Sequence, residues 1–378
     1  MKIGIDAHVI GKIAGGTETV LLGLIGGLAR IDRDNEYILY TRPGQSLERL
    51  ELPSNFRLRP LPLANPWLQR TLVMPWLCNR DHLDVIHFQR ALPLCGCRRS
   101  LLHMHDAHLR THPQLFPPLR RRVLDWVFAR SGRRAARIVT GSHTSQSEIQ
   151  QYYGVPPAKI VVVPYAVDHQ VFFREADPAR LEAVRQRLGL SGRTILHVGV
   201  LERHKNLHVL VEALALLRRD CPDVRLVIVG GPSRQSRRGY SQELRRQVNS
   251  LSLADHVVFV GHLGEDDLRL LLNVATLLAF PSSAEGFGLP PLEAMACGLP
   301  VVASDLAVLR ELYEPAALLT PVGDAQALAG AMRRVMNEPG LSEEMSRRGL
   351  ELARRYHWDQ SARRLLDVYT EVAGMGKV

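Results

Sequence analysis

The sequence predicts an α/β fold with two doubly wound domains, each built on a parallel sheet with helices on both faces. Three observations support this prediction. Short apolar runs alternate with helical patterns along the whole chain, which is typical of consecutive βαβ units. The chain has 378 residues, enough for about two domains. The alternation is interrupted near the middle, at residues 164–175.

The expected strands are short apolar runs that end where a glycine, a proline or a polar residue begins a loop. Helical patterns lie between most of them, and residues 207–219 and 241–251 are clear examples. In the first half the strands are 2–6, 37–40, 57–60, 84–87, 100–105, 138–140 and 160–163; in the second half they are 194–199, 225–230, 256–261, 277–281, 301–304 and 317–320.

The interruption at 164–175 is the expected boundary between the two domains. The first domain then spans residues 1–170, and the second spans residues 171–353. The amphipathic stretch 354–372 is expected to form a closing helix that packs back on the first domain. In sheets of this type ligands bind beyond the carboxyl ends of the strands, so functional motifs should directly follow strands.

Most of the net charge of +10 lies in the first domain, where residues 1–170 hold 22 Lys and Arg against 13 Asp and Glu. Such an excess favours an acidic partner, such as a phosphorylated lipid or an anionic membrane face. A simply solvated basic surface stays open as the alternative. No zinc-finger or aromatic RNA-binding pattern is present, so no nucleic-acid partner is expected.

Apolar runs and cysteines indicate the compartment. No run reaches the ~20 apolar residues that a membrane-spanning helix needs, and the first residues are typical of a strand, not of a signal peptide. The five cysteines show neither a disulfide framework nor the spacing of zinc ligands. The expected location is the cytoplasm, with peripheral binding to the inner face of the cell membrane if the basic surface contacts lipid. The sequence leaves the oligomeric state open.

The strongest motif is the segment 281–293, where an expected strand is followed by a glycine-rich loop and then by a helix opened by two prolines. Free backbone N–H groups at such a helix start, and glycines that allow close approach, suit a diphosphate. Glu285 precedes the loop and Glu293 lies within the helix, so the two carboxylates could accept hydrogen bonds from two different polyols. This arrangement favours a nucleotide sugar. The alternative is an ordinary turn, with Glu293 only complementing the helix dipole.

Basic residues follow the expected strand 194–199. Arg203 and Lys205 stand where a parallel sheet places its ligand, and both cations would stabilise the negative charge on a departing diphosphate. Asn206 ends this loop and is expected to help bind the donor. Leu263 follows the expected strand 256–261 and is expected to line the pocket for the nucleotide base. A solvated loop with capping charges is the alternative.

In the first domain, Gly15 and Gly16 lie between a strand and a helix and permit close backbone approach to an anion. His105 and Asp106 end the expected strand 100–105. Three histidines and an aspartate within 103–108 also suggest zinc, but their order is not that of a zinc hydrolase and no further ligands are evident, so no metal is expected. Ser142 begins another helix, where a capping role is nearly as well supported as an acceptor-side role.

Aromatic and basic residues are interleaved at 66–76 and again at 119–137. A basic amphipathic helix over the second stretch would suit an anionic membrane surface. A helix that packs on the sheet and keeps its arginines in water is equally consistent with the pattern.

The segment 285–302 closely resembles the donor signature of glycosyltransferase family 4. Glu285 and Glu293 are separated by seven residues, the run Glu-Gly-Phe-Gly-Leu-Pro opens the segment, and Glu-Ala-Met-Ala-Cys-Gly-Leu-Pro-Val-Val closes it. The resemblance extends over nearly the whole chain and is strongest over 194–304. It implies the GT-B fold, in which two Rossmann-like domains face a cleft, and a retaining reaction that needs no metal.

The resemblance also implies roles for single residues. Positions matching Glu285 contact the donor sugar near its reacting carbon, and those matching Glu293 bind the ribose hydroxyls. A His-Asp pair matching His105 and Asp106 faces the donor sugar, where His105 would hydrogen-bond a hydroxyl, orient the acceptor or help to manage its proton. Loop residues expected to bind the donor are Gly286, Phe287, Gly288 and Leu289, and the first glycine-rich loop matches Gly15 and Gly16.

The phosphate-binding pair departs from the commonest pattern. Many family members place an arginine directly after the strand's glycine, where this chain has Val200. A subset instead has Leu-Glu-Pro-Arg-Lys-Asn, which residues 201–206, Leu-Glu-Arg-His-Lys-Asn, resemble without a gap. Arg203 then takes the proline position, and Lys205 matches the family lysine. The subset is similar to mannosyl- and rhamnosyltransferases, which favours a GDP-sugar and leaves UDP- and dTDP-sugars open.

The expected function is transfer of a sugar from a nucleotide diphosphate to a glycan or a polyprenyl-diphosphate-linked acceptor in bacterial surface polysaccharide synthesis. Three alternatives are a sugar-nucleotide 2-epimerase of similar fold, a nicotinamide oxidoreductase and a non-catalytic scaffold of a polysaccharide assembly complex. The oxidoreductase would need GxGxxG after a first strand, which neither half offers convincingly. A scaffold would not need the charged set Arg203, Lys205, Glu285 and Glu293.

Overall fold

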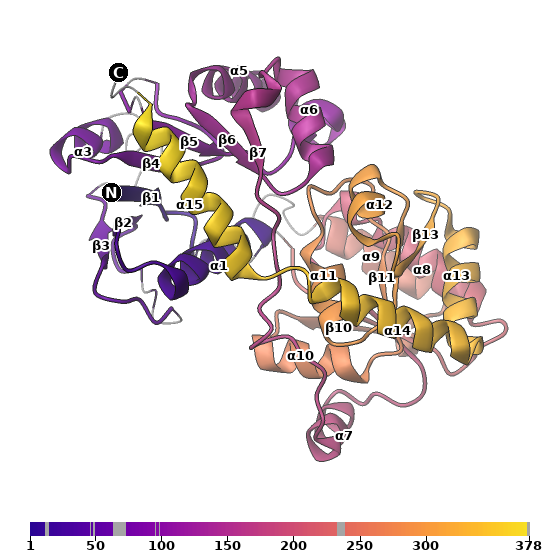
Figure 1. Ribbon diagram of the computed structural model, residues 1–378. Coiled ribbons are helices and arrows are strands. Elements are labelled where there is room, and N and C mark those ends of the chain that lie inside the picture. Colours follow the sequence, from indigo (N-terminus) through magenta and orange to yellow (C-terminus); the bar gives the residue numbers. More distant parts are fainter. Residues whose placement is uncertain are drawn as a thin grey trace. The chain divides into compact units, whose positions relative to one another are not determined.

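The computed structural model describes residues 1–11, 15–45, 47, 50–62, 73–94, 96, 97, 99–232 and 239–375. The chain divides into two compact units (Figure 1): Met1–Ala166 together with His357–Val378, and Val167–Tyr356. Each unit contains one parallel sheet with helices on both faces. The predicted fold class, two Rossmann-like doubly wound domains, is therefore confirmed.

The first unit holds a seven-stranded sheet in the order β3-β2-β1-β4-β5-β6-β7. The order reverses between β1 and β4, and Ile5 of β1 lies opposite Leu39 of β2 and His87 of β4. Loops that leave such a switch point diverge and open a crevice. The strands are β1 (Lys2–Asp6), β2 (Glu36–Thr41), β3 (Phe56–Pro60), β4 (Val85–Gln89), β5 (Ser100–His103), β6 (Arg137–Thr140) and β7 (Ile160–Val162).

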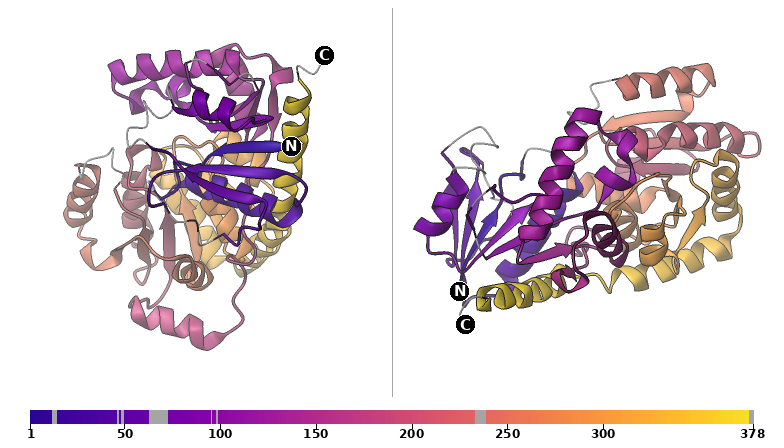
Figure 2. Two further views of the ribbon diagram at one scale, coloured as in Figure 1. Left: turned by 90° about the vertical axis from the view of Figure 1, so that its left-hand side faces the viewer. Right: turned by 90° about the horizontal axis from the view of Figure 1, so that it is seen from above.

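Helix α15 (Trp358–Gly374) belongs to the first unit although it ends the chain, and Figures 1 and 2 show it along this unit. It packs on α1 (Gly16–Ile31), where a Cβ on Gly23 would overlap the Trp358 ring and one on Gly27 would meet its carbonyl oxygen. Glycines spaced four apart thus form the groove that receives α15. The other helices are α3 (Met74–Arg80), α4 (His108–Thr111), α5 (Pro118–Arg134) and α6 (His143–Tyr153).

The second unit holds a six-stranded sheet in the order β10-β9-β8-β11-β12-β13, whose switch point lies between β8 and β11. Its strands are β8 (Thr194–Val198), β9 (Arg225–Val229), β10 (Val257–Gly261), β11 (Leu277–Phe280), β12 (Val301–Ser304) and β13 (Ala317–Thr320). Its helices are α7 (Pro178–Arg187), α8 (Leu207–Leu217), α9 (Gly239–Ser250), α10 (Glu265–Val274), α11 (Leu289–Ala296), α12 (Ala307–Tyr313), α13 (Ala325–Asn337) and α14 (Pro339–Ala353).

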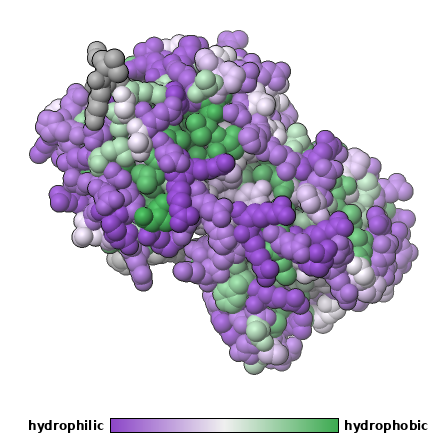
Figure 3. Space-filling model, viewed as in Figure 1, coloured by the Kyte–Doolittle hydropathy of each residue, from purple (hydrophilic) through white to green (hydrophobic). Residues whose placement is uncertain are grey.

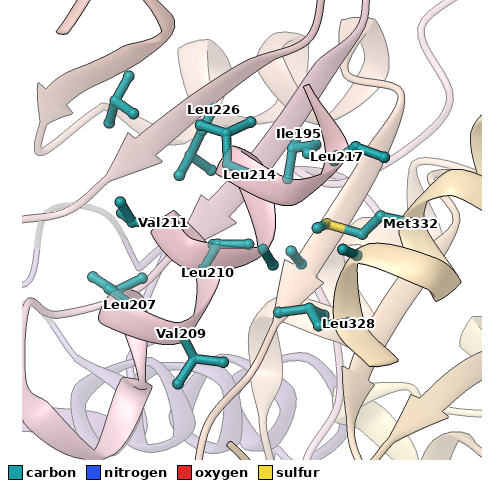
Figure 4. Packing of buried hydrophobic residues seen from close by; sticks show 14 of the residues in the cluster. Ile195, Leu207, Val209, Leu210, Val211, Leu214, Leu217, Leu226, Leu328 and Met332 are labelled. Carbon is teal, nitrogen blue, oxygen red and sulfur yellow. The ribbon is translucent and has the colours of Figure 1, made fainter. Parts of the chain in front are cut away.

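The core of the second unit shows why α8 forms a helix against this sheet. Leu210, Leu214 and Leu217 recur at helical spacing and are fully buried. They pack between strand residues such as Leu226 and residues of α13 such as Met332 (Figure 4). Each side chain of this size stabilises the fold by roughly 1.5–3 kcal/mol when buried. This packing fixes the start of α8, and with it the loop after β8.

Thirteen strands were expected, and each is present within two residues of its expected ends. Strand β5 ends at His103, two residues earlier than expected, so His105 and Asp106 lie in the following loop. The Asp106 carboxylate accepts a hydrogen bond from the His108 N–H at 2.9 Å, which turns the chain into α4. The face of the molecule in Figure 3 is mainly hydrophilic with smaller apolar areas. Within the described ranges, no helix is long and apolar enough to cross a membrane.

Candidate active site

The loops after β8 and β11 meet at the switch point of the second sheet, where a doubly wound fold binds its ligand. The Ser283 N–H and hydroxyl both donate to the His204 carbonyl, at 2.7 and 3.2 Å. These bonds join two segments that are about eighty residues apart in sequence. The two motifs singled out in the second domain therefore form one site.

Lys205 and Glu285 are the charged centre of this site. The Lys205 Nζ lies 2.6 Å from the Glu285 Oε1, and the two side chains are 12% and 10% exposed. The Lys205 ammonium also lies 5.2 Å from the centre of the Phe280 ring, a cation–π distance. Burial raises the pKa of the Glu285 carboxyl, but the Lys205 ammonium, with further contributions from Ser282 and His204, holds this pKa below its usual value. Glu285 is thus a carboxylate suited to accept hydrogen bonds, not a proton donor.

Glu293 lies in α11 in a different environment. Its side chain is partly buried, and no described residue gives its carboxyl a hydrogen bond or a neighbouring cation. Burial, with a further contribution from the nearby Glu265, raises its pKa to about 7. A partly buried carboxyl that receives no hydrogen bond lowers the stability of the fold. The Glu293 carboxyl oxygens are therefore available to accept hydrogen bonds from a ligand.

The start of α11 is shaped by backbone conformation and buried aromatic rings. Gly288 has a φ of 83°, and an added Cβ would come within 3.0 Å of Leu309. The Tyr313 hydroxyl donates to the Gly288 carbonyl at 2.8 Å, and the buried Phe287 ring packs edge-on against Tyr313. Tyr313 and Phe287 therefore fix the conformation of the turn that carries the loop amides.

Two prolines reduce the number of backbone N–H donors at the start of α11. Pro290 and Pro291 occupy the first turn and carry no backbone N–H. The N–H groups of Gly288 and Leu289 have no backbone acceptor among the described residues. At this terminus the N–H groups of Gly288 and Leu289 are the backbone donors that suit a diphosphate.

Arg203 is not brought together with Lys205 and Glu285. Its guanidinium lies 2.5 Å from Glu243 of α9 and 5.5 Å from the centre of the Tyr240 ring, and its side chain is 67% exposed. Asn206, by contrast, is buried, adopts a left-handed conformation with a φ of 50°, and begins α8 directly after Lys205. The structure thus places Lys205 and Asn206 at the site, while Arg203 stands on its exposed rim.

Glycines at the ends of β8, β9 and β10 bring these strand ends close together, next to Leu263, which was expected to lie at a base pocket. A Cβ on Gly230, whose φ is 121°, would overlap the carbonyl oxygen of Gly199. A Cβ on Gly231 would come within 3.0 Å of the His262 ring, which precedes the half-buried Leu263. A glycine after each of three successive strands was the sequence signal for this close approach.

His197 of β8 is a second residue that the motifs did not reveal. Its Nδ1 lies 3.1 Å from the Ala279 carbonyl, and its buried Nε2 has no partner among the described residues. Burial lowers its pKa to about 4, so the imidazole is neutral. A histidine inside an otherwise apolar strand was the signal in the sequence.

In the first unit, the loop after β1 leads to the switch point at β4. Gly15 has an extended backbone and precedes α1, and a Cβ added to Gly16 would meet no atom within 4 Å, so the backbone at Gly16 borders open space. Glu18 accepts a hydrogen bond from the Gly11 N–H at 2.8 Å and closes the loop. Arg90, which follows β4, donates to the Thr17 hydroxyl at 3.0 Å.

His105 and Asp106 lie at the end of β5 with different partners. His105 Nδ1 is 2.6 Å from the Tyr165 hydroxyl, and burial lowers the pKa of His105 to about 3. Burial alone would raise the pKa of Asp106, but His108, His105 and Arg90 together lower it below its usual value. His103 Nε2 also faces the Tyr165 hydroxyl, at 2.9 Å. In the described part of the chain, no three His, Cys, Asp or Glu side chains are grouped as ligands of a metal ion.

Ser142 is the N-cap of α6, and its hydroxyl accepts a hydrogen bond from the Ser145 N–H at 3.1 Å. The capping role considered from the sequence is therefore present. Of the interleaved aromatic and basic stretch at 66–76, residues 66–72 lie outside the described residues, and Trp76 is 55% exposed.

Two family models match the chain, one on each unit. Residues 14–171 match the model described as Glycosyltransferase Family 4, and residues 182–352 match Glycosyl transferases group 1. The D-inositol 3-phosphate glycosyltransferase of Acidothermus cellulolyticus is 37% identical over 245 residues, which are 63% of this chain and 53% of that protein. The chain thus spans about half the length of this relative. The O-antigen chain mannosyltransferase B of Escherichia coli is 28% identical over 293 residues, 77% of this chain and 75% of that protein.

Solved structures share the whole fold. Sucrose-phosphate synthase from Thermosynechococcus elongatus superposes with a TM-score of 0.80 at 23% identity, over 98% of this chain and 99% of that chain. Anabaena HepE in complex with UDP and glucose gives a TM-score of 0.77 at 21% identity, over 98% and 99%. Each of the two units thus matches a glycosyltransferase family model, and the architecture of the chain is the GT-B fold that these solved structures share.

Proposed function

We propose that the protein transfers a sugar, with retention of anomeric configuration, from a nucleotide diphosphate to a glycan or a polyprenyl-diphosphate-linked acceptor. The observation that carries this proposal is the contrast between two carboxyls at one site. Glu285 is paired with Lys205 and ionised, whereas Glu293 has no donor among the described residues. A nucleotide sugar offers hydroxyls at both ends and a diphosphate between them, and so complements this pattern.

In the proposed donor complex, the Lys205 ammonium neutralises the diphosphate while remaining close to Glu285. Loop amides from Gly286 to Leu289 add backbone donors. Glu285 then accepts hydrogen bonds from the donor sugar, and Glu293 accepts them from the ribose. Arg203 would have to leave Glu243, an exposed ion pair that costs little to break, to reach the phosphate.

The proposed reaction needs no metal, because Lys205 and the loop amides stabilise charge where it develops on the leaving diphosphate. Glu285 is ionised and already bonded to Lys205, so it orients the sugar and does not attack it. The acceptor oxygen would then attack from the face that the diphosphate leaves. The departing phosphate oxygen would take the acceptor proton, which balances the step.

Mannose or rhamnose is the favoured sugar. The resemblance of residues 201–206 to mannosyl- and rhamnosyltransferases supports this choice, and so does the similarity to an O-antigen chain mannosyltransferase. The similarity to D-inositol 3-phosphate glycosyltransferases adds a phosphorylated polyol as a second class of acceptor. The polyprenyl-diphosphate-linked acceptor and the phosphorylated polyol are both anionic, which suits the basic first half of the chain.

A thermal-shift panel of GDP-, UDP-, dTDP- and ADP-sugars tests this proposal. One nucleotide class should stabilise the protein, with a GDP-sugar favoured, by roughly 3 kcal/mol at a hundredfold excess over its Kd. Glu293→Gln should reduce the shift strongly, and Glu314→Gln, a change at an exposed carboxyl of the same unit, should not. Absence of any shift at millimolar nucleotide sugar would contradict donor binding.

We also propose that α5 brings the protein to an anionic membrane. Leu119, Val123 and Trp126 are 78%, 49% and 55% exposed and lie on one side of the first half of this helix. The exposed side chains of Arg120 and Arg122 flank them. The second half of α5 packs inward instead, and its Arg134 donates to the Pro93 carbonyl at 2.8 Å. The exposed first half of α5 supports the membrane-binding interpretation. The second half is packed, as the alternative interpretation expected.

A further inference from the structure

Two cysteines of the first unit are in contact although they are far apart in the sequence. The Cys78 Sγ and the Cys97 Sγ lie 2.8 Å apart, which is about 0.8 Å more than the length of a disulfide bond. Both are free thiols. Cys78 belongs to α3, and Cys97 lies between β4 and β5. Their separation of 19 positions matches no disulfide or metal motif, so the sequence did not indicate this pair.

The backbone around Cys97 allows its segment to reach α3. Gly96 has a φ of 74°, and Cys97 has a φ of 54°, which is uncommon for a residue with a side chain. A Cβ added to Gly96 would lie 2.8 Å from the Cβ of Pro75 in α3, so a glycine is needed for this close approach. Uncommon backbone conformations persist where the surrounding structure enforces them, and they often accompany a functional residue.

Helix α5 fixes the same segment from another direction. Arg134 donates to the Leu94 carbonyl at 2.7 Å and to the Gly96 carbonyl at 3.3 Å, and Arg130 donates to the Leu94 carbonyl at 3.0 Å. Cys78 is 8% exposed and belongs to the buried core of the first unit. The two sulfur atoms are therefore held together by segments that are each anchored elsewhere.

The two thiols differ in exposure and in proton affinity. Cys97 is partly exposed, whereas Cys78 is buried. The hydrogen bond with Cys97 and burial both raise the pKa of Cys78, so the Cys78 thiol keeps its proton. Because a thiolate is the nucleophile and exposure admits an oxidant, Cys97 is the sulfur that should react first.

We propose that Cys78 and Cys97 form a site of reversible oxidation, at which a hydroperoxide converts the two thiols into a disulfide. Two cysteines that only filled the core would both be buried, but here one sulfur is accessible and the other lies directly behind it. This pairing of a reactive and a resolving thiol is typical of redox-sensitive cysteines. The inference does not depend on the proposed transferase function.

The oxidation balances with hydrogen peroxide as the oxidant. The Cys97 sulfur attacks one peroxide oxygen, the O–O bond breaks, and Cys97 becomes a sulfenic acid while one water is released. The Cys78 sulfur then attacks the Cys97 sulfur, the S–O bond breaks, and the hydroxyl leaves with the Cys78 proton as a second water. Two electrons pass from the thiols to the peroxide. A dithiol reductant reverses the change by thiol–disulfide exchange.

The disulfide would close a ring of residues 78–97, which contains the whole of β4. Arg90, which follows β4 within this ring, donates to the Thr17 hydroxyl near the start of α1 at 3.0 Å. A bond across such a ring stabilises a folded chain mainly because it restricts the unfolded chain. Oxidation should therefore make the first unit more resistant to unfolding.

Peptide mapping by mass spectrometry tests the proposal on the full chain. The reduced protein is treated with hydrogen peroxide, its remaining thiols are alkylated, and the digest is analysed. We expect peptides joined through Cys78 and Cys97, two fewer alkylated thiols than in the reduced protein, and complete reversal by dithiothreitol. Cys95→Ser, at a position outside the described residues, and Cys221→Ser should give the same map. A Cys97 that is joined to another cysteine, or that ends as a sulfinic acid, would overturn the proposal.

Two variants test the order of the reaction. In Cys78→Ser, Cys97 should stop at the sulfenic acid and be captured by dimedone. In Cys97→Ser, Cys78 should react with peroxide at least about tenfold more slowly than Cys97 does in the wild type. Equal reaction of Cys78 would contradict the assigned order. The wild-type map decides the disulfide even where a variant does not fold.

Urea unfolding measures the effect of the bond on stability. Oxidation should raise the urea concentration at the midpoint for the wild type and leave the midpoint of Cys97→Ser unchanged. A cross-linked wild type with the midpoint of the reduced protein would overturn the expected restraint.

Discussion

Two glutamates at one site show how neighbouring side chains set the state of a residue. Glu285 and Glu293 lie on one loop and the helix that follows it, and burial raises the pKa of both. Only Glu285 has a described cation within hydrogen-bonding distance, the Lys205 ammonium. The pKa of Glu285 therefore ends below its usual value, while that of Glu293 rises to about 7.

Glu293 should make the ligand-free fold less stable as pH rises. Its pKa in the folded chain is about 7, against 4.5 for an exposed glutamate. Between these values the unfolded chain ionises first, so stability falls as pH rises from about 4.5 to 7 and is constant above. Glu293→Gln should remove this cost and stabilise the ligand-free protein at pH 8 by at most about 3 kcal/mol.

Urea unfolding at pH 5 and pH 8 measures how the ionisation of Glu293 changes the free energy of unfolding. The gain of Glu293→Gln over the wild type should be larger at pH 8, and Glu314→Gln should show no such difference. An equal gain at both pH values would exclude an ionisation effect. The same carboxyl should bind the donor more tightly above pH 7, because ribose hydroxyls donate to its ionised form.

The Lys205–Glu285 pair should behave as one unit in stability measurements. Lys205→Met leaves the Glu285 carboxylate buried without its cation and should cost about 3 kcal/mol or more in unfolding free energy. The double change Lys205→Met/Glu285→Gln should recover part of this loss. Arg203→Met, which breaks an exposed pair with Glu243, should cost less than about 1 kcal/mol.

Both the single Lys205→Met change and the double change should abolish stabilisation by nucleotide sugars. A double-mutant cycle in denaturant, together with thermal shifts, provides the comparison. Additive costs for Lys205 and Glu285 would mean that the two side chains are not coupled, contrary to their 2.6 Å separation.

At the scale of single residues, the sequence predicted which residues lie at the candidate site better than it predicted where their side chains point. Spacing alone singled out Lys205, Glu285 and Glu293, because a strand–loop–helix unit fixes where such residues stand. The direction of Arg203 depends on Glu243 of α9, which local spacing does not reveal. Tyr165 was missed for the same reason: its contact with His105 spans sixty positions and two strands.

Elements were predictable where periodicity is strong. Each strand is a short apolar run between turn residues, and the thirteen runs are the thirteen strands of the described chain. The end of β5 was placed too late, because apolar pattern alone does not show that Asp106 turns the chain by accepting the His108 N–H. Helix α5 was ambiguous because its two halves have different surroundings.

The exposed half of α5 gives a prediction about membranes. Leu119→Ser/Trp126→Ser removes two large exposed apolar side chains, and binding to vesicles rich in anionic lipid should fall at least roughly tenfold. Vesicle co-sedimentation at low and high salt is the measurement, and binding should weaken as salt rises. Leu251→Ser, a change at an exposed leucine of the second unit, is the control. Equal binding of both variants would exclude α5 as the contact.

At the scale of the whole molecule, each unit is a doubly wound sheet with its candidate site residues after the strands. The second unit carries the charged pair, the ordered loop and the unsatisfied carboxyl that suit a nucleotide sugar. The first unit carries His105 and most of the excess positive charge. The fold followed from periodicity and the likeness to glycosyltransferases followed from motifs. The sugar and the acceptor did not follow, because no described residue forms a pattern specific for a base or a sugar epimer.

Mass spectrometry of the acceptor tests the central claim most directly. The full chain is incubated with each nucleotide sugar and with either a polyprenyl-diphosphate-linked oligosaccharide or D-inositol 3-phosphate. We predict that one donor releases its nucleoside diphosphate while one acceptor gains the mass of one sugar, and that Glu285→Gln and Lys205→Met abolish both changes while Glu314→Gln does not. Conversion of the nucleotide sugar without any gain of mass by an acceptor would contradict the transferase and support the epimerase.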